Sequence, residues 1–232
     1  IPLFTFALTP SIFHSAPEIV GTSLFGVFLN ALSGTYAYVK QHRVYFKAAI
    51  PFAIATLPGA ILGSLVSDYF TGPTFSLSYG IFILIISAIM YWNSSNKKAI
   101  ATNFDETLFI ARKKLGIILS MFVGFISSIF GIGGGIIHVP VMIYALAFPP
   151  HMATATSHFV LAVSSFMGVT SHIFLNHIVW IPALAVGFGA VIGAQIGARL
   201  SKKTKPRSII LLLCISLFLL GIRMIVESNL LF

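Results

Sequence analysis

The sequence predicts an all-α, polytopic membrane protein made of two inverted repeats, each a glycine-tipped helical hairpin followed by three transmembrane helices. Three observations predict this fold. Hydrophobic residues make up 57% of the 232 residues and charged residues only 8%, whereas a soluble domain carries about 25% charged residues. Basic residues gather in a few loops, and segments of the first half recur in the second. So few charges cannot cover a surface in water, which indicates a membrane protein.

Six apolar stretches are long enough to cross the hydrocarbon of a bilayer, which takes about 20 helical residues. They lie near residues 17–39, 48–67, 73–93, 152–174, 178–200 and 207–227. Two shorter stretches, 115–130 and 136–148, flank a run of glycines and are marginal as full spans at about 1.5 Å per residue. Residues 1–12 resemble the second of them.

The basic residues set the orientation of these spans. Of the 14 Lys and Arg residues, 13 fall in the stretches 40–47, 97–114 and 199–207, and the turns at 68–72 and 175–177 contain none. By the positive-inside rule, the three basic stretches are expected to be cytoplasmic. Topology therefore accounts for the basic excess, and we expect no nucleic-acid partner.

The charge pattern also divides the chain. We expect a first transmembrane repeat over 1–93, a basic cytoplasmic loop over 94–114 and a second repeat over 115–232. The span at 152–174 must start inside, because the uncharged turn that follows it is outside. Residues 115–150 should therefore leave and return to the same membrane face, as a helical hairpin with the glycines at its tip.

Two pairs of segments reveal an internal repeat. "GTSLF" at 21–25 recurs as "ATSHF" at 155–159, and "GAILGS" at 59–64 recurs as "GAQIGA" at 193–198, in both cases 134 residues further along. One offset shared over much of each half indicates a real repeat. The loops after equivalent spans differ in charge, so the halves have opposite orientations. Inverted repeats are typical of secondary transporters, whose sites lie near the midplane at discontinuous helices.

The repeat also predicts a gap at its beginning. Pro140 follows "GIGGG", whereas its counterpart Pro2 follows only Ile1. We therefore expect the first arm of the first hairpin to be missing from this chain.

The glycine run and its surroundings carry a family resemblance. "GIGGG" at 131–135, then Val139-Pro140 and Ala155-Thr156-Ser157, resembles the TauE/SafE sulfite exporter family, also called TSUP. The resemblance covers essentially the whole chain. It implies a secondary transporter, an exporter, of small sulfur-containing anions such as sulfite, organosulfonates or thiosulfate.

The glycine run is the leading candidate for the substrate site. Non-helical backbone at membrane depth is tolerated where it lines a polar cavity, and glycines bring N–H donors close to a ligand. If 136–148 is helical, its N-terminus also favours an oxyanion. We therefore assign substrate binding to Gly131, Gly133, Gly134 and Gly135. The alternative, close packing of helices through small residues, is preferred for Gly59, Gly63, Gly193 and Gly197.

Polar side chains inside the spans complete the predicted site. Hydroxyl donors occur at equivalent places in both halves, and one amide lies inside the first span, where it needs a partner or a cavity. These residues are Thr22, Ser23, Asn30, Thr156 and Ser157. Hydroxyls in membrane helices often only bond a carbonyl of the preceding turn, so a structural role stays open for them.

Two histidines are candidates for proton coupling. His158 follows the Thr-Ser pair and His138 follows the glycines, and a protonated imidazole there would favour a bound anion. The first half has Leu24 in place of His158. A neutral core histidine is the alternative for each. The histidines lack the carboxylates or cysteines of a good metal site, and we expect neither a metal nor another cofactor.

The resulting expectation is a multi-pass cell-membrane transporter and no enzyme. Its partners would be a small anionic substrate and the lipid bilayer, and a homo-oligomer stays open. Two alternatives stay open. One is a carrier of another small anion or metabolite on the same scaffold. The other is an intramembrane acyltransferase with His138 as base, although no paired nucleophile or carboxylate supports it.

Overall fold

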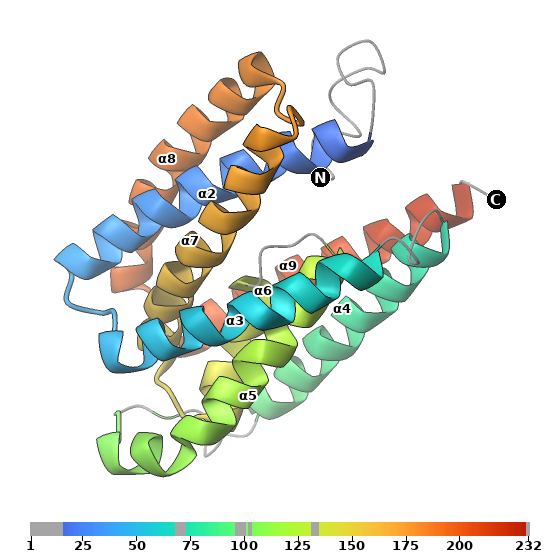
Figure 1. The fold of residues 1–232 in the computed structure, drawn as a ribbon. Helices are drawn as coiled ribbons and strands as arrows, with labels where there is room; N and C mark the ends of the chain where they lie inside the picture. The colour runs from blue at the N-terminus through green and yellow to red at the C-terminus, as the bar shows by residue number, and fades with distance from the viewer. Residues whose placement is uncertain (1–15, 68–72, 96–100, 102–103, 131–134, 231–232) are drawn as a thin grey trace.

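The described part of the chain is built from long helices. The computed structural model describes residues 16–67, 73–95, 101, 104–130 and 135–230, and all regular structure in these residues is helical. Figure 1 shows the helices as long rods that cross one another at shallow and steep angles. The predicted all-α class is confirmed.

Each of the six expected spans is a helix. Those of the first repeat are α2 (Ala16–Lys40), α3 (Phe46–Ser67) and α4 (Pro73–Ser95), and those of the second are α7 (Pro150–Phe174), α8 (Trp180–Lys203) and α9 (Pro206–Leu230). Four of them, α3, α7, α8 and α9, are long and apolar enough over their described residues to cross a membrane, and α4 contains a shorter apolar stretch, Leu77–Asn93. These helices make the protein a polytopic membrane protein.

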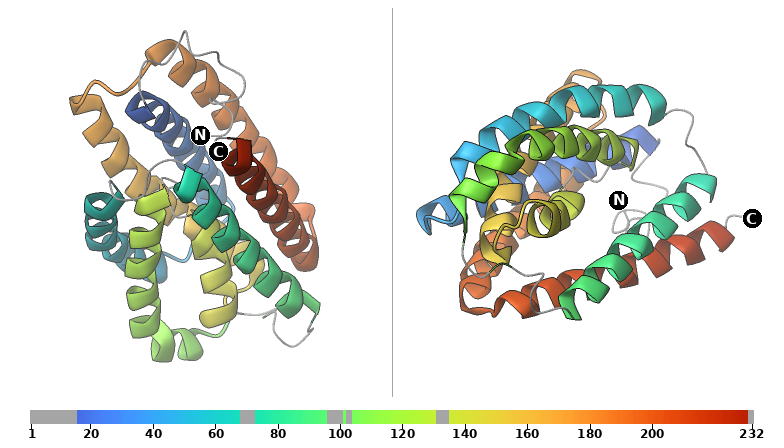
Figure 2. Two further views of the ribbon diagram at one scale, coloured as in Figure 1. Left: turned by 90° about the vertical axis from the view of Figure 1, so that its right-hand side faces the viewer. Right: turned by 90° about the horizontal axis from the view of Figure 1, so that it is seen from below.

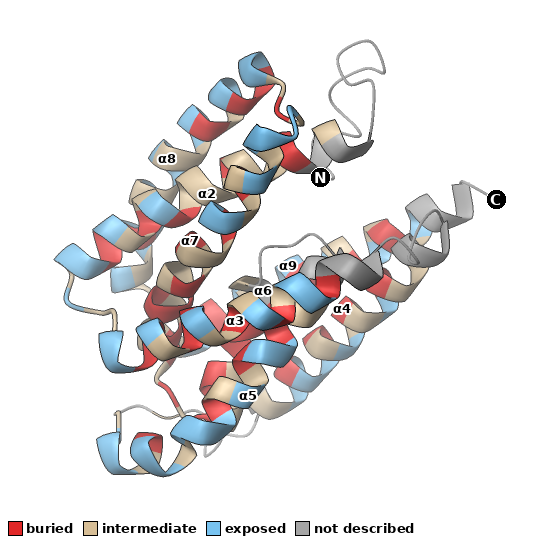
Figure 3. Cartoon of the chain, in the orientation of Figure 1, coloured by how far each residue is buried: buried red, intermediate tan, exposed pale blue. Residues whose placement is uncertain are grey.

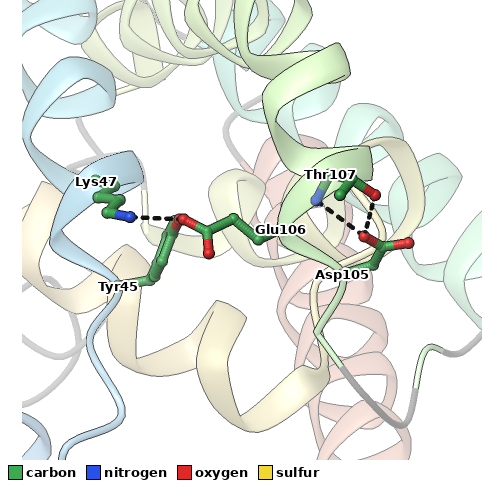
Figure 4. Close-up of polar contacts among 5 residues, drawn as sticks. All are labelled: Tyr45, Lys47, Asp105, Glu106 and Thr107. Carbon is green, nitrogen blue, oxygen red and sulfur yellow. Dashed lines mark hydrogen bonds and ion pairs between the residues drawn. The ribbon is translucent and has the colours of Figure 1, made fainter.

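The first arm of the hairpin is longer than the sequence suggested. Helix α5 runs over Glu106–Phe130 and has 25 residues, which corresponds to about 37 Å. Its first three turns include Arg112, Lys113 and Lys114, which we expected in a loop. Asp105 begins the helix early, because its Oδ1 atom accepts hydrogen bonds from the backbone N–H groups of Thr107 and Leu108 at 2.9 and 3.2 Å. This is an N-cap, and Figure 4 shows Asp105 with Thr107.

The hairpin returns to the end where it started, as predicted. At the start of α5, Glu106 Oε1 lies 2.6 Å from Lys47 Nζ and accepts a hydrogen bond from Tyr45 Oη at 3.0 Å (Figure 4). At the start of α7, His151 contacts Arg43 at 2.9 Å. Both contacts involve the turn between α2 and α3. We call this end of the molecule, which carries Lys40, Arg43, Lys47, Lys202 and Lys203, the basic end.

The returning arm is irregular. It consists of α6 (Gly135–Pro140) and a π-helical turn, η2 (Val141–Ala145). Pro140 has no N–H to donate to the helix, and beyond it Leu146 N bonds the carbonyl of Val141 at 3.3 Å in the wider π pattern. Arg112 of α5 donates to the carbonyl of Ala145 at 2.9 Å. The two arms are therefore tied together near the basic end.

The helix contacts follow a pseudo-twofold symmetry. Helix α2 packs against α7 and α8, α7 packs against α2 and α3, and α4 packs along α9. Exchanging the repeats turns α2 into α7, α3 into α8 and α4 into α9. The pairs α2–α7 and α4–α9 then map onto themselves, and α2–α8 maps onto α7–α3. Figure 2 shows α4 and α9 side by side in both views.

The symmetry holds at single residues. Helices α2 and α7 begin at Ala16 and Pro150, 134 residues apart, and α3 and α8 begin at Phe46 and Trp180 with the same offset. The turns between them have matching backbone conformations, with φ of 55° at His42 and 56° at Asn176. The offset found in the sequence is therefore the offset of the fold.

The expected helix packing at glycines is confirmed at Gly59 of the first repeat. A Cβ built at Gly59 would lie 1.9 Å from the carbonyl oxygen of Met121, so α3 and α5 approach closely there. The equivalent Gly193 and the nearby Gly197 are exposed, with no heavy atom of the described residues within 4 Å of a Cβ built there. No described helix covers this face of α8, so the expected packing role of Gly193 and Gly197 stays a prediction.

The outer surface is apolar, as a lipid-facing surface should be. Exposed residues alternate with buried ones along each helix in Figure 3, and the exposed ones include Trp92, Ile181 and Phe188. Ile181 alone is 85% exposed. In water such patches would promote association, whereas in a bilayer they meet lipid chains of similar polarity.

Candidate functional site

The end of the glycine run lies against α7. Gly131, Gly133 and Gly134 lie outside the described residues. Gly135 is the first residue of α6, and a Cβ built there would be 3.0 Å from Leu161 Cδ2. The returning arm of the hairpin therefore starts beside the middle of α7.

The face of α7 that meets Gly135 carries hydroxyl groups. Ser157, Leu161 and Ser164 are spaced four and three residues apart, which places them on one helix face. Ser157 is buried, and its hydroxyl donates to the carbonyl of Thr154 at 3.0 Å. Ser164 donates to the carbonyl of Leu161 at 3.1 Å. Each hydroxyl bonds its own helix, as the structural alternative predicted.

Helix α2 carries the equivalent stripe. Ser23, Val27 and Asn30 occupy the positions of Ser157, Leu161 and Ser164, 134 residues earlier, and all three are partly buried. The structure thus brings the predicted Ser23 and Asn30 onto one face of α2. It also adds Ser164, which the sequence analysis missed. The repeat could have identified Ser164, because it is the counterpart of Asn30 in the second half.

Thr22 and Thr156 make one symmetric pair of hydrogen bonds. Thr156 Oγ1 accepts from the backbone N–H of Tyr45 at 3.2 Å, and Thr22 Oγ1 accepts from that of Val179 at 3.0 Å. Both threonines are 0% exposed. Each therefore holds the start of a helix of the other repeat. Their part in substrate binding stays a prediction, since these bonds occupy only acceptor sites of the hydroxyls.

His158 lies in the contact between the repeats. Its Nδ1 atom is 3.1 Å from the carbonyl oxygen of Thr154, and its ring packs edge-on against Tyr38 at 5.2 Å between centroids. The ring also touches Gly34 of α2. At the equivalent place in the other half, Leu24 touches Gly168. The asymmetry expected between His158 and Leu24 therefore lies at this interface.

His138 lies inside the hairpin. It is 2% exposed, and its Nε2 atom is 3.2 Å from Ser120 Oγ on α5. This contact ties α6 to α5. A role for His138 in proton coupling stays a prediction.

The described residues offer no metal centre. They contain no group of three or more His, Cys, Asp and Glu side chains that could hold an ion.

A polar contact between the repeats that the sequence analysis did not assign involves α8. There Gln195 Nε2 donates to the carbonyl and the hydroxyl of Ser33 at 2.8 and 2.9 Å. It adds to the polar groups where α2 meets α8.

Relatives of the chain carry the names of membrane transporters. The chain is 35% identical over 224 residues to the probable membrane transporter protein YunE of Bacillus subtilis, covering 91% of this chain and 82% of that protein. It is 29% identical over 216 residues to the probable membrane transporter protein MJ0441 of Methanocaldococcus jannaschii, covering 89% and 78%. A probable membrane transporter protein of Xylella fastidiosa is 27% identical over 186 residues, covering 79% and 69%.

The family match spans both repeats. No solved structure gives a significant match to the chain. The family model described as "Sulfite exporter TauE/SafE" matches residues 1–224. It confirms the resemblance carried by the glycine run and the Ala-Thr-Ser segment. With its multi-pass helical fold and relatives named as membrane transporters, the chain is a membrane transporter that belongs to the TauE/SafE family.

Proposed function

We propose that the chain is a secondary transporter that exports small sulfur-containing anions such as sulfite, organosulfonates or thiosulfate. One observation carries the proposal. The end of the glycine run, Gly135, lies against Leu161, which shares a face of α7 with Ser157 and Ser164. The start of α6 thus lies beside a hydroxyl-bearing face of α7, and inverted-repeat transporters bind their substrates near the contact between the repeats.

The distribution of charge supports an anionic substrate. The chain has 14 Lys and Arg residues against five acidic residues, which are Glu18, Asp68, Asp105, Glu106 and Glu227. The described ones, Glu18, Asp105, Glu106 and Glu227, lie at or beside a helix end, so no described helix carries a carboxylate at mid-span. Cation pumps and carriers usually place carboxylates there. Neutral hydroxyl and amide donors suit an anion that must bind and leave again.

The symmetric contacts support alternating access. In transporters with inverted repeats, one repeat rocks against the other around a fixed site, so that each end opens in turn. Here α2 and α7 cross antiparallel as the central pair of that symmetry. The stripe Ser157–Leu161–Ser164 and its counterpart Ser23–Val27–Asn30 lie at equivalent positions of these two helices, which supports a site shared by the two repeats.

Flux measurements test the proposal. Purified protein in proteoliposomes should move radiolabelled sulfite or taurine. Gly134→Leu and Asn30→Leu should lower the flux at least tenfold without changing the yield of folded protein, because both residues would line the site. Gly193→Leu is the matched control, since the same side chain is added on an open face of α8. Normal flux in Gly134→Leu and Asn30→Leu would reject the site.

The substrate panel separates the remaining functions. If the protein transports another small anion or metabolite but none of sulfite, taurine or thiosulfate, the proposed substrate class is wrong. The proposal of a transporter with two inverted repeats would still stand. An acyl-transfer assay on the same preparation tests the enzyme alternative. His138, its candidate base, is buried against Ser120, and we expect no acyl transfer.

A further inference from the structure

Three segments meet around one arginine at the basic end. Arg43 lies in the turn between α2 and α3. Its Nη1 atom donates to Gln41 Oε1 at 2.9 Å and to Ser201 Oγ at 3.0 Å. Its Nη2 atom lies 2.9 Å from His151 Nδ1, which accepts, and donates to the His151 carbonyl at 3.3 Å. Each terminal nitrogen of a guanidinium has two N–H groups, so these contacts use both nitrogens fully.

The same contacts join the two repeats. Arg43 and Gln41 belong to the first repeat, whereas His151 begins α7 and Ser201 ends α8 in the second. Gln41 Nε2 also donates to the carbonyl of Ala198 at 3.3 Å. The guanidinium carbon lies 5.0 Å from the centroid of the Tyr38 ring, a cation–π contact. We call these residues, Tyr38, Gln41, Arg43, His151 and Ser201, the Arg43 cluster.

Burial shows that the cluster is not an ordinary solvated loop. Arg43 is partly buried, and this burial lowers its pKa. Tyr38 is buried together with Ala37, Ala155 and Ala198, which come from both repeats. The cluster therefore covers a small buried contact between the repeats at the basic end.

The opposite end of the interface is held differently. His177 occupies the position equivalent to Arg43, and His172 the position equivalent to Tyr38. The Nδ1 atoms of His177 and His172 lie 3.3 Å apart, so this contact stays within the second repeat. Thr22 and Val179 supply a bond between repeats at this end, as Thr156 and Tyr45 do at the basic end. The contacts of Arg43 with the other repeat therefore do not follow the pseudo-twofold symmetry, because the equivalent His177 bonds within its own repeat.

We propose that Arg43 is the lock that keeps the cytoplasmic end of the repeat interface closed, acting as a positioning residue in transport. The inference rests on the proposed rocking of the repeats. Opening the basic end separates α2 from the start of α7 and the end of α8, so the bonds from Arg43 to His151 and Ser201 must break. They re-form when that end closes, and the site then opens to the other side.

Thiol accessibility at the basic end tests the lock without any substrate. In a Cys214→Ala background, Ala37→Cys places one thiol in the buried contact behind the cluster. A membrane-impermeant maleimide, added from the basic side of reconstituted protein, reports how often this end opens. Arg43→Gln should raise the modification rate about tenfold, because it removes charged contacts that favour the closed state. Arg43→Lys keeps the charge but cannot bridge both partners, and it should give an intermediate rate.

Two controls separate a lock from a general loosening. His177→Gln changes the equivalent position at the opposite end and should leave the rate at Ala37→Cys unchanged. A second probe, Ala183→Cys, is buried at that opposite end, and Arg43→Gln should not raise its modification. An unchanged rate at Ala37→Cys, or an equal rise at both probes, would overturn the proposal. The readout needs no transported anion, so a wrong substrate class would leave the result intact.

Discussion

The imidazole of His158 lies against the backbone of Gly34 on the other repeat, where a Cβ would be only 2.7 Å from His158 Cδ2. At the symmetry-equivalent contact, a Cβ on Gly168 would be 2.6 Å from Leu24 Cδ2. The two glycines therefore give nearly the same space to an aromatic, titratable ring in one case and to an aliphatic side chain in the other.

Gly34→Ala should destabilise the protein more than Gly168→Ala. The His158 ring is held by the Thr154 carbonyl and by Tyr38, whereas the end of Leu24 can rotate away from an added methyl. Overpacking of this kind costs about 1–3 kcal/mol where the neighbour cannot move. Thermal unfolding of both variants in one detergent measures the difference. Equal melting temperatures would mean that His158 is not held in place.

His158→Gln should flatten the pH dependence of substrate binding. If a protonated His158 lies near the bound anion, proton and anion stabilise each other's binding. Substrate affinity then rises as pH falls through the pKa of the imidazole and is lost as pH rises. Glutamine keeps a donor but gains no charge, so the variant should bind more weakly at low pH. Identical affinity profiles for both proteins, from pH 5 to 8, would remove His158 from coupling.

Thr156→Val should cost about 1–3 kcal/mol of stability, since it leaves the N–H of Tyr45 without its acceptor. Thr156→Ser keeps the oxygen and should be close to the parent. Thr22→Val should behave like Thr156→Val, because it removes the symmetric bond to Val179. Chemical denaturation in mild detergent gives the comparison. A substrate role would appear separately, as a higher KM in Thr156→Val than in a variant of equal stability.

Gly59→Ala should be strongly destabilising and Gly193→Ala neutral. The added methyl at Gly59 would meet the carbonyl of Met121 in the backbone of α5, which cannot rotate away, whereas Gly193 has open space. The two positions are equivalent in the repeat, so intrinsic helix propensity cancels in the comparison. Yield of folded protein and melting temperature report the result. Similar losses in both variants would show that another helix covers α8 at Gly193.

Cysteines at Ser95 and Thr204 should resist membrane-impermeant thiol reagents in intact cells. Both residues adjoin basic stretches that the positive-inside rule assigns to the cytoplasm. A cysteine at Asn176 is the control, because this exposed turn residue lies at the opposite end. It should react readily from outside. The reverse labelling pattern would overturn the assigned orientation.

The sequence predicted the parts of the fold that hydropathy and charge determine. All six expected spans are helices, and the 134-residue offset recurs in the helix bounds, because a bilayer requires apolar stretches of fixed length and leaves cations in the loops. The start of α5 was placed too late. Arg112, Lys113 and Lys114 suggested a loop, yet Asp105 caps a helix there, and Arg112 bonds the returning arm.

The side-chain contacts between the two repeats could not be predicted from the sequence. The repeat showed that Thr22 matches Thr156, but not that each accepts a backbone N–H from the other half. Arg43 looked like one more topological cation, because nothing in the sequence shows its contacts with His151 and Ser201. Hydropathy fixes which residues enter the membrane, whereas these contacts depend on the crossing of helices far apart in the sequence.

The pairing of His158 with Leu24 has an energetic consequence. In a perfectly symmetric molecule, exchanging the conformations of the two halves would give a second structure of identical free energy. Such a molecule would have no preferred resting state. Each substitution that distinguishes the halves at their contact lifts this degeneracy. Leu24 opposite Gly168 and His158 opposite Gly34 therefore give the two structures different ground-state energies.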